Sequence, residues 1–426
     1  MRLRIMTIAS ILLCLLHTEV SSQQLAAVDF QNLRRTKPEF LLNCLDIELG
    51  QKVDSVALEK CLQDLRNLNL FLTIDASMVV LDSSNVKLVF NCKESNYTYP
   101  IFSIGGFDQK LNLSLGAGDI NFRGRAESFG FLYQYYDRHS FRLYHSSLFL
   151  GNSKFGHDLS LGKLSTVEPL YFNERTNLFN FDNYHASLGI HYWFTRHFRI
   201  GTGGMFMYER YVNRGEDVLF DGFAIRNNRL IEFFKYQVRA YAQWNRVNFL
   251  YERRNGFQNT LFGETITTVD YEDLLFTKAT NELKWFALIG NKGVFNFRNR
   301  VGISTNNEGP FSPFVIDGFV NIRGSGDRVA RGTGEVIFNT EYTHTIVDHD
   351  WFYLMTNAFV DIGYLRPPGG SFDFNPQNNP NAFYYSGVGL KVQSKKFYNS
   401  LIRLDYGFNI NNTAQSGFIF GFGNFF

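Results

Sequence analysis

The chain has 426 residues, and its 42 basic and 40 acidic side chains leave a formal net charge of +2. This balance gives no reason to expect a nucleic acid or an acidic substrate as a partner. The sequence contains 45 Phe and 22 Tyr residues but only 9 Pro residues. Aromatic-rich, glycine-punctuated sequence in which apolar and polar residues alternate is typical of transmembrane β-barrels, and a soluble β-sandwich or propeller is the alternative.

Residues 1–22 are expected to be a cleaved signal peptide. Two arginines precede an apolar run from Ile5 to Leu16, and a polar stretch ends at Ser22, which is the three-part layout of a secretory signal. The apolar run has about a dozen residues, whereas a membrane-spanning helix needs roughly 20, so an anchor is the weaker alternative. Cys14 follows a leucine inside the run, which argues against lipidation.

Residues 23–95 are predicted to form a small α+β domain. A strand at Leu25–Leu33 opens it, and two β segments, Phe71–Leu81 and Val86–Cys92, close it. Two helices are expected between these strands. Thr36 and Glu39 have the spacing of a capping box at the start of the first helix.

The second helix is capped by Asp54 or Ser55. Its apolar residues recur at roughly helical spacing: Val56, Leu58, Leu62, Leu65 and Leu68. The order of elements is therefore β-α-α-β-β.

Three cysteines follow the predicted signal: Cys44, Cys61 and Cys92. Their odd number and scattered spacing argue against a disulfide scaffold or a zinc site. We expect them to be buried small apolar residues, with a Cys44–Cys61 disulfide as the alternative in an oxidising compartment.

The β-α-α-β-β order, in about seventy residues, resembles a POTRA domain, the periplasmic unit of the BamA/TamA superfamily of outer-membrane insertases and translocators. The segments that carry the likeness are Leu49–Asp54, Leu65–Phe71 and Val86–Phe90. The resemblance implies a periplasmic module that offers a strand edge to unfolded chains. A plain spacer at the mouth of a barrel is the alternative.

Residues 96–426 are predicted to form a transmembrane antiparallel β-barrel, so the expected fold class is mainly β. Segments of roughly ten residues alternate between apolar and polar side chains, and turn residues separate them. In the clearest segment, Leu401–Ile410, residues such as Ile402 and Leu404 would face lipid, and Arg403 and Asp405 would face the interior. About twenty residues per strand and connection give about 16 strands.

The end of the sequence resembles the carboxy-terminal targeting strand of bacterial outer-membrane barrels. Phe418, Phe420, Phe422 and Phe426 share one face, and an aromatic residue occupies the last position. A soluble core strand is the alternative, but glycines opposite these rings would leave it poorly filled.

A connection of about thirty residues, beyond the length of a passive turn, separates the strand candidates 293–304 and 334–345. It contains Ile322-Arg323-Gly324, and a later strand contains Phe359-x-Asp361-x-Gly363. These segments resemble the two best-known barrel motifs of the superfamily. One is an Ile/Val-Arg-Gly-aromatic tip on a long extracellular loop folded into the lumen, and the other is a strand opposite it.

Strand parity supports this pairing independently. Asp361 shares a face with Gly363, and Glu341 shares a face with Asn339, opposite their apolar neighbours, so both carboxylates should point into the lumen. The guanidinium of Arg323 could then make a forked contact with a carboxylate. Ser325 stands where the family motif has an aromatic residue, which puts the anchoring of the loop in doubt.

The first and last barrel strands are expected to pair poorly. Gly105 and Gly106 lie in the first, and Gly421 and Gly423 lie in the last. Glycines weaken a strand interior and allow sharp bending. In the resembling family this seam opens sideways and templates incoming strands, and simple curvature for barrel closure is the alternative.

The resemblance covers essentially the whole mature chain and implies non-enzymatic insertion or translocation of proteins in the outer membrane. The expected partners are unfolded outer-membrane or secreted proteins, outer-membrane lipid and periplasmic accessory proteins. His145, His191 and His344 lie in strand candidates without any hydrolase signature, so no enzyme, cofactor or metal site is predicted. A two-partner secretion pore and a passive porin are the rival functions. Such secretion pores usually carry two POTRA modules and an extra amino-terminal segment, which we do not find.

Overall fold

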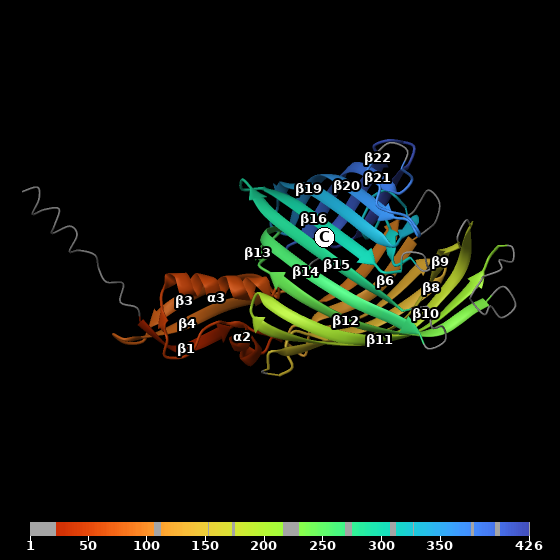
Figure 1. The fold of residues 1–426 in the computed structure, drawn as a ribbon. Coiled ribbons are helices and arrows are strands. Elements are labelled where there is room, and N and C mark those ends of the chain that lie inside the picture. Colours follow the sequence, from red (N-terminus) through yellow and green to blue (C-terminus); the bar gives the residue numbers. More distant parts are fainter. Residues whose placement is uncertain are drawn as a thin grey trace, which may run out of the picture. The chain divides into compact units, whose positions relative to one another are not determined.

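The computed structural model divides into two compact units, one ending at Glu94 and one beginning at Ser95. It describes residues 23–105, 112–151, 153–172, 175–215, 230–268, 275–306, 312–326, 328–375, 379–396 and 401–425 (Figure 1). The predicted signal peptide, Gly106 and Phe426 lie outside the described residues. Neither described helix has the length and apolar character needed to cross a membrane.

The first unit is a four-stranded sheet with two helices. Its elements are β1 (Gln23–Gln31), α2 (Pro38–Cys44), β2 (Lys52–Val53), α3 (Ser55–Asn67), β3 (Phe71–Val80) and β4 (Asn85–Glu94). The sheet order is β2-β1-β4-β3, in which β1 and β4 are parallel and the other pairs antiparallel. Alternate residues of β4 from Val86 to Cys92 are fully buried and form the centre of the core. The predicted small α+β fold of this unit is confirmed.

Two details of the helices differ from the sequence prediction. Asp54 caps α3 as expected, since its carboxylate accepts the N–H of Ala57 at 2.8 Å. The capping box at α2 is wrong, because the N-cap is Lys37 and no side chain caps it. Val56, predicted on the apolar face of α3, is 76% exposed because the buried face begins only at Cys61.

The three cysteines are buried and none of them forms a disulfide. Their predicted role as small apolar residues is confirmed, and the alternative Cys44–Cys61 disulfide is not formed. Burial of the Cys92 thiol, together with the nearby Glu94 carboxylate, raises its pKa to about 12. A thiol of this kind stays protonated and unreactive at neutral pH.

The second unit is a closed antiparallel barrel, and the described residues provide its 16 main strands. They are β5 (Thr98–Gly105), β6 (Asn112–Phe122), β7 (Glu127–Tyr136), β8 (His139–Ser147), β9 (Phe155–Phe172), β10 (Arg175–Thr195), β11 (Phe198–Asn213), β12 (Leu230–Asn245), β14 (Arg253–Thr268), β15 (Phe276–Ile289), β16 (Gly293–Ser304), β19 (Gly334–Asp348), β20 (Phe352–Arg366), β21 (Ala382–Ser394), β22 (Leu401–Asn409) and β23 (Ser416–Phe422). A short strand, β13 (Asn248–Leu250), pairs with the start of β14. Strands β17 (Phe314–Ile316) and β18 (Ala330–Gly332) form a separate two-stranded sheet. The predicted fold class and strand number are confirmed.

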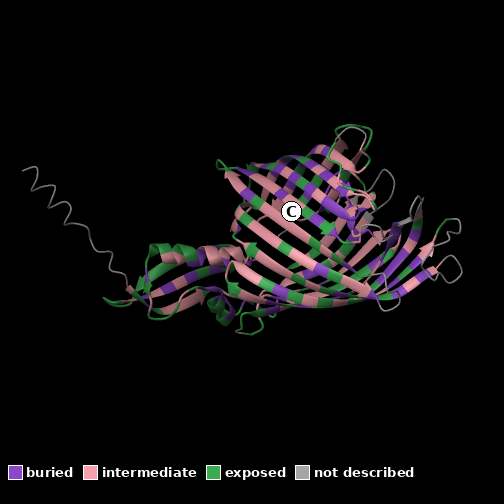
Figure 2. Ribbon diagram, viewed as in Figure 1, coloured by how far each residue is buried: buried purple, intermediate pink, exposed green. Residues whose placement is uncertain are grey.

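Burial alternates from residue to residue along strands such as β19, β20 and β22, and Figure 2 shows this banding on the barrel ribbons. In β22 the interior residues Arg403 and Asp405 are 5% and 0% exposed, whereas Ile402 and Leu404 are 37% and 42% exposed. The predicted parity of this strand is confirmed. An apolar outer surface around polar interior side chains is suited to hydrocarbon rather than to water.

Glu94 ties the chain before α2 to the last strand of the first unit. Its carboxylate accepts the backbone N–H groups of Arg35 (3.1 Å) and Thr36 (2.8 Å). Burial alone would raise the pKa of Glu94, but hydrogen bonds from the side chain and N–H of Thr36 outweigh it and hold the pKa below its ordinary value. The ionised carboxylate therefore stabilises the folded unit above the unfolded-state pKa, and this stability is lost as pH falls through the lower folded-state pKa.

We predict that Glu94→Gln reduces local stability around α2 by about 1.5–3 kcal/mol at neutral pH, the usual contribution of hydrogen bonds to a charged group. Hydrogen exchange of the full chain, measured at neutral pH and again at acidic pH, reports this loss. The wild-type protection should fall on acidification, whereas the variant should change little. Glu39→Gln is the control, because Glu39 is exposed on α2 and makes no capping contact. Equal effects of the two substitutions would contradict the role of Glu94.

Candidate functional site

The connection between β16 and β19 lies against the interior wall of the barrel. These two strands are paired neighbours, so the connecting chain leaves and returns at adjacent positions. Its β17–β18 sheet and Ile322 pack against interior side chains of β19, β20 and β21. The buried cluster consists of Phe314, Ile316, Ile322, Ile337, Leu365 and Tyr385. This apolar contact accounts for the inward course of the connection.

A tight turn presents the tip of this loop. The backbone carbonyl of Asp317 accepts the N–H groups of Asn321 (3.0 Å) and Ile322 (3.1 Å). The Asn321 side chain accepts the N–H of Asp317 at 2.9 Å and donates to the carbonyl of Val315 at 2.7 Å. The turn therefore satisfies its own polar groups and fixes the position of the next residue, Arg323.

Arg323 is fully buried and makes a forked contact with Asp361. Its Nε and Nη2 donate to the two carboxylate oxygens of Asp361, both at 2.9 Å, and its backbone N–H donates to Oδ2 at 3.0 Å. Nη1 donates to Oε2 of Glu341 at 2.5 Å. Asp361 and Glu341 are 0% and 3% exposed. The structure thus brings together the three charged residues that the sequence singled out.

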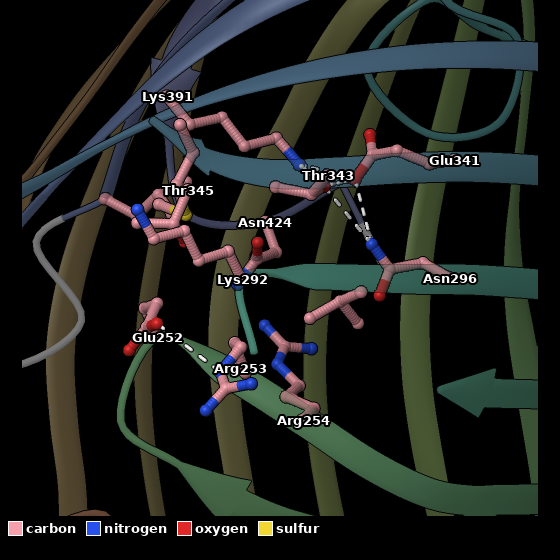
Figure 3. A pocket seen from close by; sticks show the side chains of 13 residues that line it. Glu252, Arg253, Arg254, Lys292, Asn296, Glu341, Thr343, Thr345, Lys391 and Asn424 are labelled. Atoms are coloured by element: carbon pink, nitrogen blue, oxygen red, sulfur yellow. Dashed lines mark hydrogen bonds and ion pairs between the residues drawn. The ribbon is translucent and has the colours of Figure 1, made fainter. Parts of the chain in front are cut away.

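Polar neighbours hold the two carboxylates in place. The Asn339 amide donates to Asp361 (2.8 Å) and to the carbonyl of Asn321 (2.7 Å), so it joins the wall to the loop. Lys391 donates to the second oxygen of Glu341 at 2.5 Å. Figure 3 shows Lys391 and Asn296 pointing toward Glu341 and Thr343, across a pocket from Glu252, Arg253 and Arg254.

The charges of this network balance. Arg403 pairs with Asp405 at 3.2 Å, and Asn357 donates to Asp405 at 3.0 Å and to Glu341 at 3.3 Å. Three buried cations therefore accompany three buried carboxylates: Arg323, Lys391 and Arg403 with Asp361, Glu341 and Asp405. Burial of charge is tolerable only with such pairing, because each ion loses its hydration.

Two aromatic rings enclose the guanidinium, and the sequence prediction missed both contacts. The Cζ of Arg323 lies 3.7 Å from the ring centroid of Phe359 and 4.2 Å from that of Phe425. Phe359 opens the Phe-x-Asp-x-Gly motif, so its presence next to the arginine had a signal in the sequence. Phe425 follows the last strand and had none. Ser325, which stands where the family motif has an aromatic residue, donates a long hydrogen bond of 3.5 Å to the carbonyl of Gly326. The two rings give the Arg323 guanidinium cation–π contacts.

Glycines allow the loop backbone to lie on the wall. Gly324 has φ +87°, and a Cβ there would lie 2.4 Å from the carbonyl oxygen of Gly407 on β22. A Cβ on Gly407 would lie 2.4 Å from the carbonyl oxygen of Arg323. On β20, a Cβ on Gly363 would meet the side chain of Ile322 at 3.0 Å. Gly324 and Gly363, both predicted as site residues, are therefore at the contact surface.

The barrel closes by antiparallel pairing of β23 with β5. In the described part of the chain, β23 and β5 pair through Ile419 with Gly105, Phe420 with Ile104 and Gly421 with Ser103. The register between β22 and β23 has seven pairs, and that between β5 and β6 has eight. Gly423 lies beyond the strand with φ +85°, and the ring of Phe422 contacts Phe102 edge-on. Gly106 and Phe426 are not described, so their predicted roles stay predictions.

No group of three or more His, Cys, Asp or Glu side chains in the described ranges is arranged to hold a metal ion. His145 contacts His157 at 2.9 Å and Glu127 at 3.6 Å, but it lies on the outer face beside Phe129. His191 is buried in β10, and His344 contacts Tyr342.

No protein-family model and no curated protein matches this sequence. Solved structures do share its fold. BamA from Haemophilus ducreyi lacking POTRA domains 1–3 has 14% identity and a TM-score of 0.53, and the match covers 94% of this chain and 84% of the BamA chain. CdiB from Acinetobacter baumannii has 13% identity and a TM-score of 0.57, with 94% and 74% covered. CdiB from Escherichia coli has 12% identity and a TM-score of 0.60, with 94% and 76% covered. The fold is thus that of the BamA and CdiB barrels, as the resemblance in the sequence led us to expect.

We predict that Asp361→Asn destabilises the folded barrel by about 3–5 kcal/mol, because it removes one partner of a buried ion pair while preserving side-chain shape. Urea unfolding of the purified protein in lipid vesicles measures the change. Asp158→Asn is the matched control, since Asp158 also faces the interior and pairs with Arg239 at 2.6 Å but is 42% exposed. A loss below about 1 kcal/mol is expected there. Similar losses in both variants would show that burial of the Asp361 pair is unimportant.

A methyl group at position 407 should undock the loop. Gly407→Ala places a carbon against the carbonyl of Arg323, so we expect trypsin to cleave the loop after its arginines in the folded protein, at least about tenfold faster than in wild type. Gly263→Ala is the control, because nothing lies within 4 Å of a Cβ at that strand position. Unchanged resistance of the Gly407→Ala protein to trypsin would refute close docking of loop and strand.

Proposed function

We propose that the barrel spans the bacterial outer membrane, with residues 23–94 in the periplasm. There it acts without enzymatic chemistry, inserting β-barrel proteins into this membrane or translocating proteins across it. The observation that carries the proposal is the loop docked in the interior through Arg323 and Asp361. A passive porin needs an open lumen and no such buried charge network. The fold shared with BamA and CdiB supports the same class of function.

The seam between β23 and β5 suits the proposed mechanism. In lipid, an unpaired backbone group costs several kcal/mol, so a strand enters a membrane only by exchanging hydrogen bonds. In the described part of the chain three registered pairs join β23 to β5, and two of them include a glycine, which weakens a strand interior. Once separated, both strands would offer an edge to an incoming strand. Locally disturbed outer-membrane lipid would lower the barrier further.

The first unit has an edge strand that could receive an unfolded chain. In the sheet order β2-β1-β4-β3, strand β3 lies at the edge. Its residues Met78, Val79 and Val80 are 36%, 44% and 62% exposed. An exposed apolar edge strand supports binding of extended polypeptides by β-augmentation. Unfolded outer-membrane or secreted proteins are thus the proposed substrates, and periplasmic accessory proteins could use the same edge.

Dedicated secretion of one exoprotein is the second candidate function. The two CdiB structures match this barrel with TM-scores of 0.57 and 0.60 over 94% of the chain. In a secretion pore the substrate would pass through the lumen after the loop moves, whereas in an insertase it would pair at the seam. The two candidates therefore differ in the part of the barrel that must open.

Depletion of the protein followed by outer-membrane proteomics tests the proposed function. Broad loss of barrel proteins is expected for an insertase, and loss of one exported protein is expected for a secretion pore. An unchanged outer-membrane and secreted proteome would contradict both candidates and favour the porin.

A disulfide across the seam separates the two candidates. Ser103→Cys and Gly421→Cys place two Cβ atoms opposite one another, since a Cβ at position 421 would lie 3.4 Å from that of Ser103. We expect the oxidised variant to lose insertion and a reductant to restore it. Asn259→Cys with Leu283→Cys, a facing pair on β14 and β15, is the control and should stay active. Full activity of the oxidised seam variant would exclude opening at the seam and favour passage through the lumen.

A further inference from the structure

The loop has a second ionic attachment to the wall, distinct from Asp361. Arg331 on β18 lies 2.5 Å from the carboxylate of Glu168 on β9, and Arg328 pairs with the same carboxylate. Glu168 is only 2% exposed. One buried glutamate therefore receives two guanidinium groups from the loop.

Glu168 and Asp361 stand on opposite sides of the barrel. Asp361 lies on β20 and Glu168 on β9. In the closed order of the 16 main strands, seven intervene in one direction (β21, β22, β23, β5, β6, β7 and β8). Seven also intervene in the other (β19, β16, β15, β14, β12, β11 and β10).

Glu168 lies at the end of the barrel from which the loop starts. Neighbouring strands are antiparallel throughout, and six steps separate β9 from β16, so these two strands run in the same direction. Glu168 lies within the last five residues of β9, and the loop begins at the end of β16. The chain that leaves β16 is therefore attached to its own wall by Arg323 and to the opposite wall by Arg328 and Arg331.

Backbone pairing and a side-chain hydrogen bond make the segment between the two attachments rigid. Arg331 pairs with Val315 across the β17–β18 sheet, and its Nη1 donates to the carbonyl of Ser312 at 2.7 Å. The same small sheet packs in the apolar cluster around Ile322 described above. A rigid segment of this kind moves as one body, so a displacement at one attachment reaches the other, whereas a flexible loop would not transmit it.

The side of the lumen that bears Glu168 contains open space. A cavity of about 510 Å³ is lined there by residues of β7 to β12, including Arg142, Ser160, His185 and Arg239. On the side that bears Asp361, the loop packs against β19, β20 and β21. Movement of the far end of the loop would therefore extend an existing hollow rather than create one.

We propose that residues 312–326 and 328–332 form a strut across the lumen, and that Glu168 is the fastening that keeps the strut closed. Releasing this fastening opens a conducting path while Arg323 stays docked on Asp361. The inference rests on the proposed function only in placing the barrel in a membrane. Glu168 is the more easily released attachment, because it is a single carboxylate between two cations, and these cations repel each other once its charge is removed.

Conductance of the purified full-length protein in planar lipid bilayers tests the proposal. Glu168→Gln should increase the fraction of time spent in conducting states about tenfold or more. Glu209→Gln is the matched control, because Glu209 is also buried and ion-paired in the lumen, but its partner Lys235 (2.6 Å) lies on the adjacent wall strand. It should conduct like wild type. An equally closed Glu168→Gln protein, or an equally open Glu209→Gln protein, would overturn the proposal.

A second set of variants guards against simple misfolding. Arg328→Gln with Arg331→Gln should reproduce the conductance of Glu168→Gln, and the triple variant should conduct no more than either, because all three residues form one attachment. Additive effects would contradict a single fastening. The bilayer contains no polypeptide substrate, so the conductance result does not depend on the proposed function. An unchanged proteome after depletion would contradict the proposed function but not the role of Glu168. A Glu168→Gln protein that conducts no more than wild type would contradict the role of Glu168 but not the proposed function.

Discussion

Burial of the Arg323 guanidinium is the constraint on which the rest of the site depends. An ion without water must recover its lost hydration energy from fixed neighbours, and here two carboxylates, two aromatic faces and a balancing set of further charges provide this. The surrounding features follow from that requirement. Asn339 orients Asp361, Lys391 compensates Glu341, and the paired glycines at 324 and 407 let the backbone approach closely enough for the fork to form. The loop is thus held by a buried network whose members lose their compensation together when one of them leaves.

The same network reaches the strands that close the barrel. Strand β22 contributes Arg403, Asp405 and Gly407, and it pairs with β23, which forms the seam. Phe425 follows β23 and lies against both Arg323 and Arg403, at 4.2 Å and 5.1 Å from ring centroid to Cζ. Movement of the terminal segment therefore removes an aromatic face from the buried guanidinium. In physical terms, docking of the loop and closure of the seam share residues, so neither can change without a free-energy cost to the other.

Much of this fold could be predicted because period-two alternation directly reports which side of a strand is buried. The alternation predicted which residues of β22 face the interior and that Asp361 and Glu341 point inward. The length of the connection after β16 indicated a functional loop. Alternation cannot report which residues meet across a lumen. Lys391, Phe425 and Glu168 were missed for this reason, since their partners come from distant strands or from the loop. The capping box at Thr36 failed because a distant carboxylate, Glu94, takes the hydrogen bonds that local spacing had assigned to the helix.

A double-mutant cycle on Arg323 and Asp361 measures whether the two side chains interact in the folded barrel. Unfolding free energies of the wild type, Arg323→Gln, Asp361→Asn and the double variant, measured in lipid vesicles, give the coupling energy between the two side chains. If Arg323 and Asp361 form a buried ion pair, the coupling energy should be roughly 1–3 kcal/mol. The double variant should then lose less stability than the two single variants lose together. Additivity within about 0.5 kcal/mol would mean that the two residues do not interact in the membrane-embedded protein. The loop would then not be held inside the barrel by this ion pair.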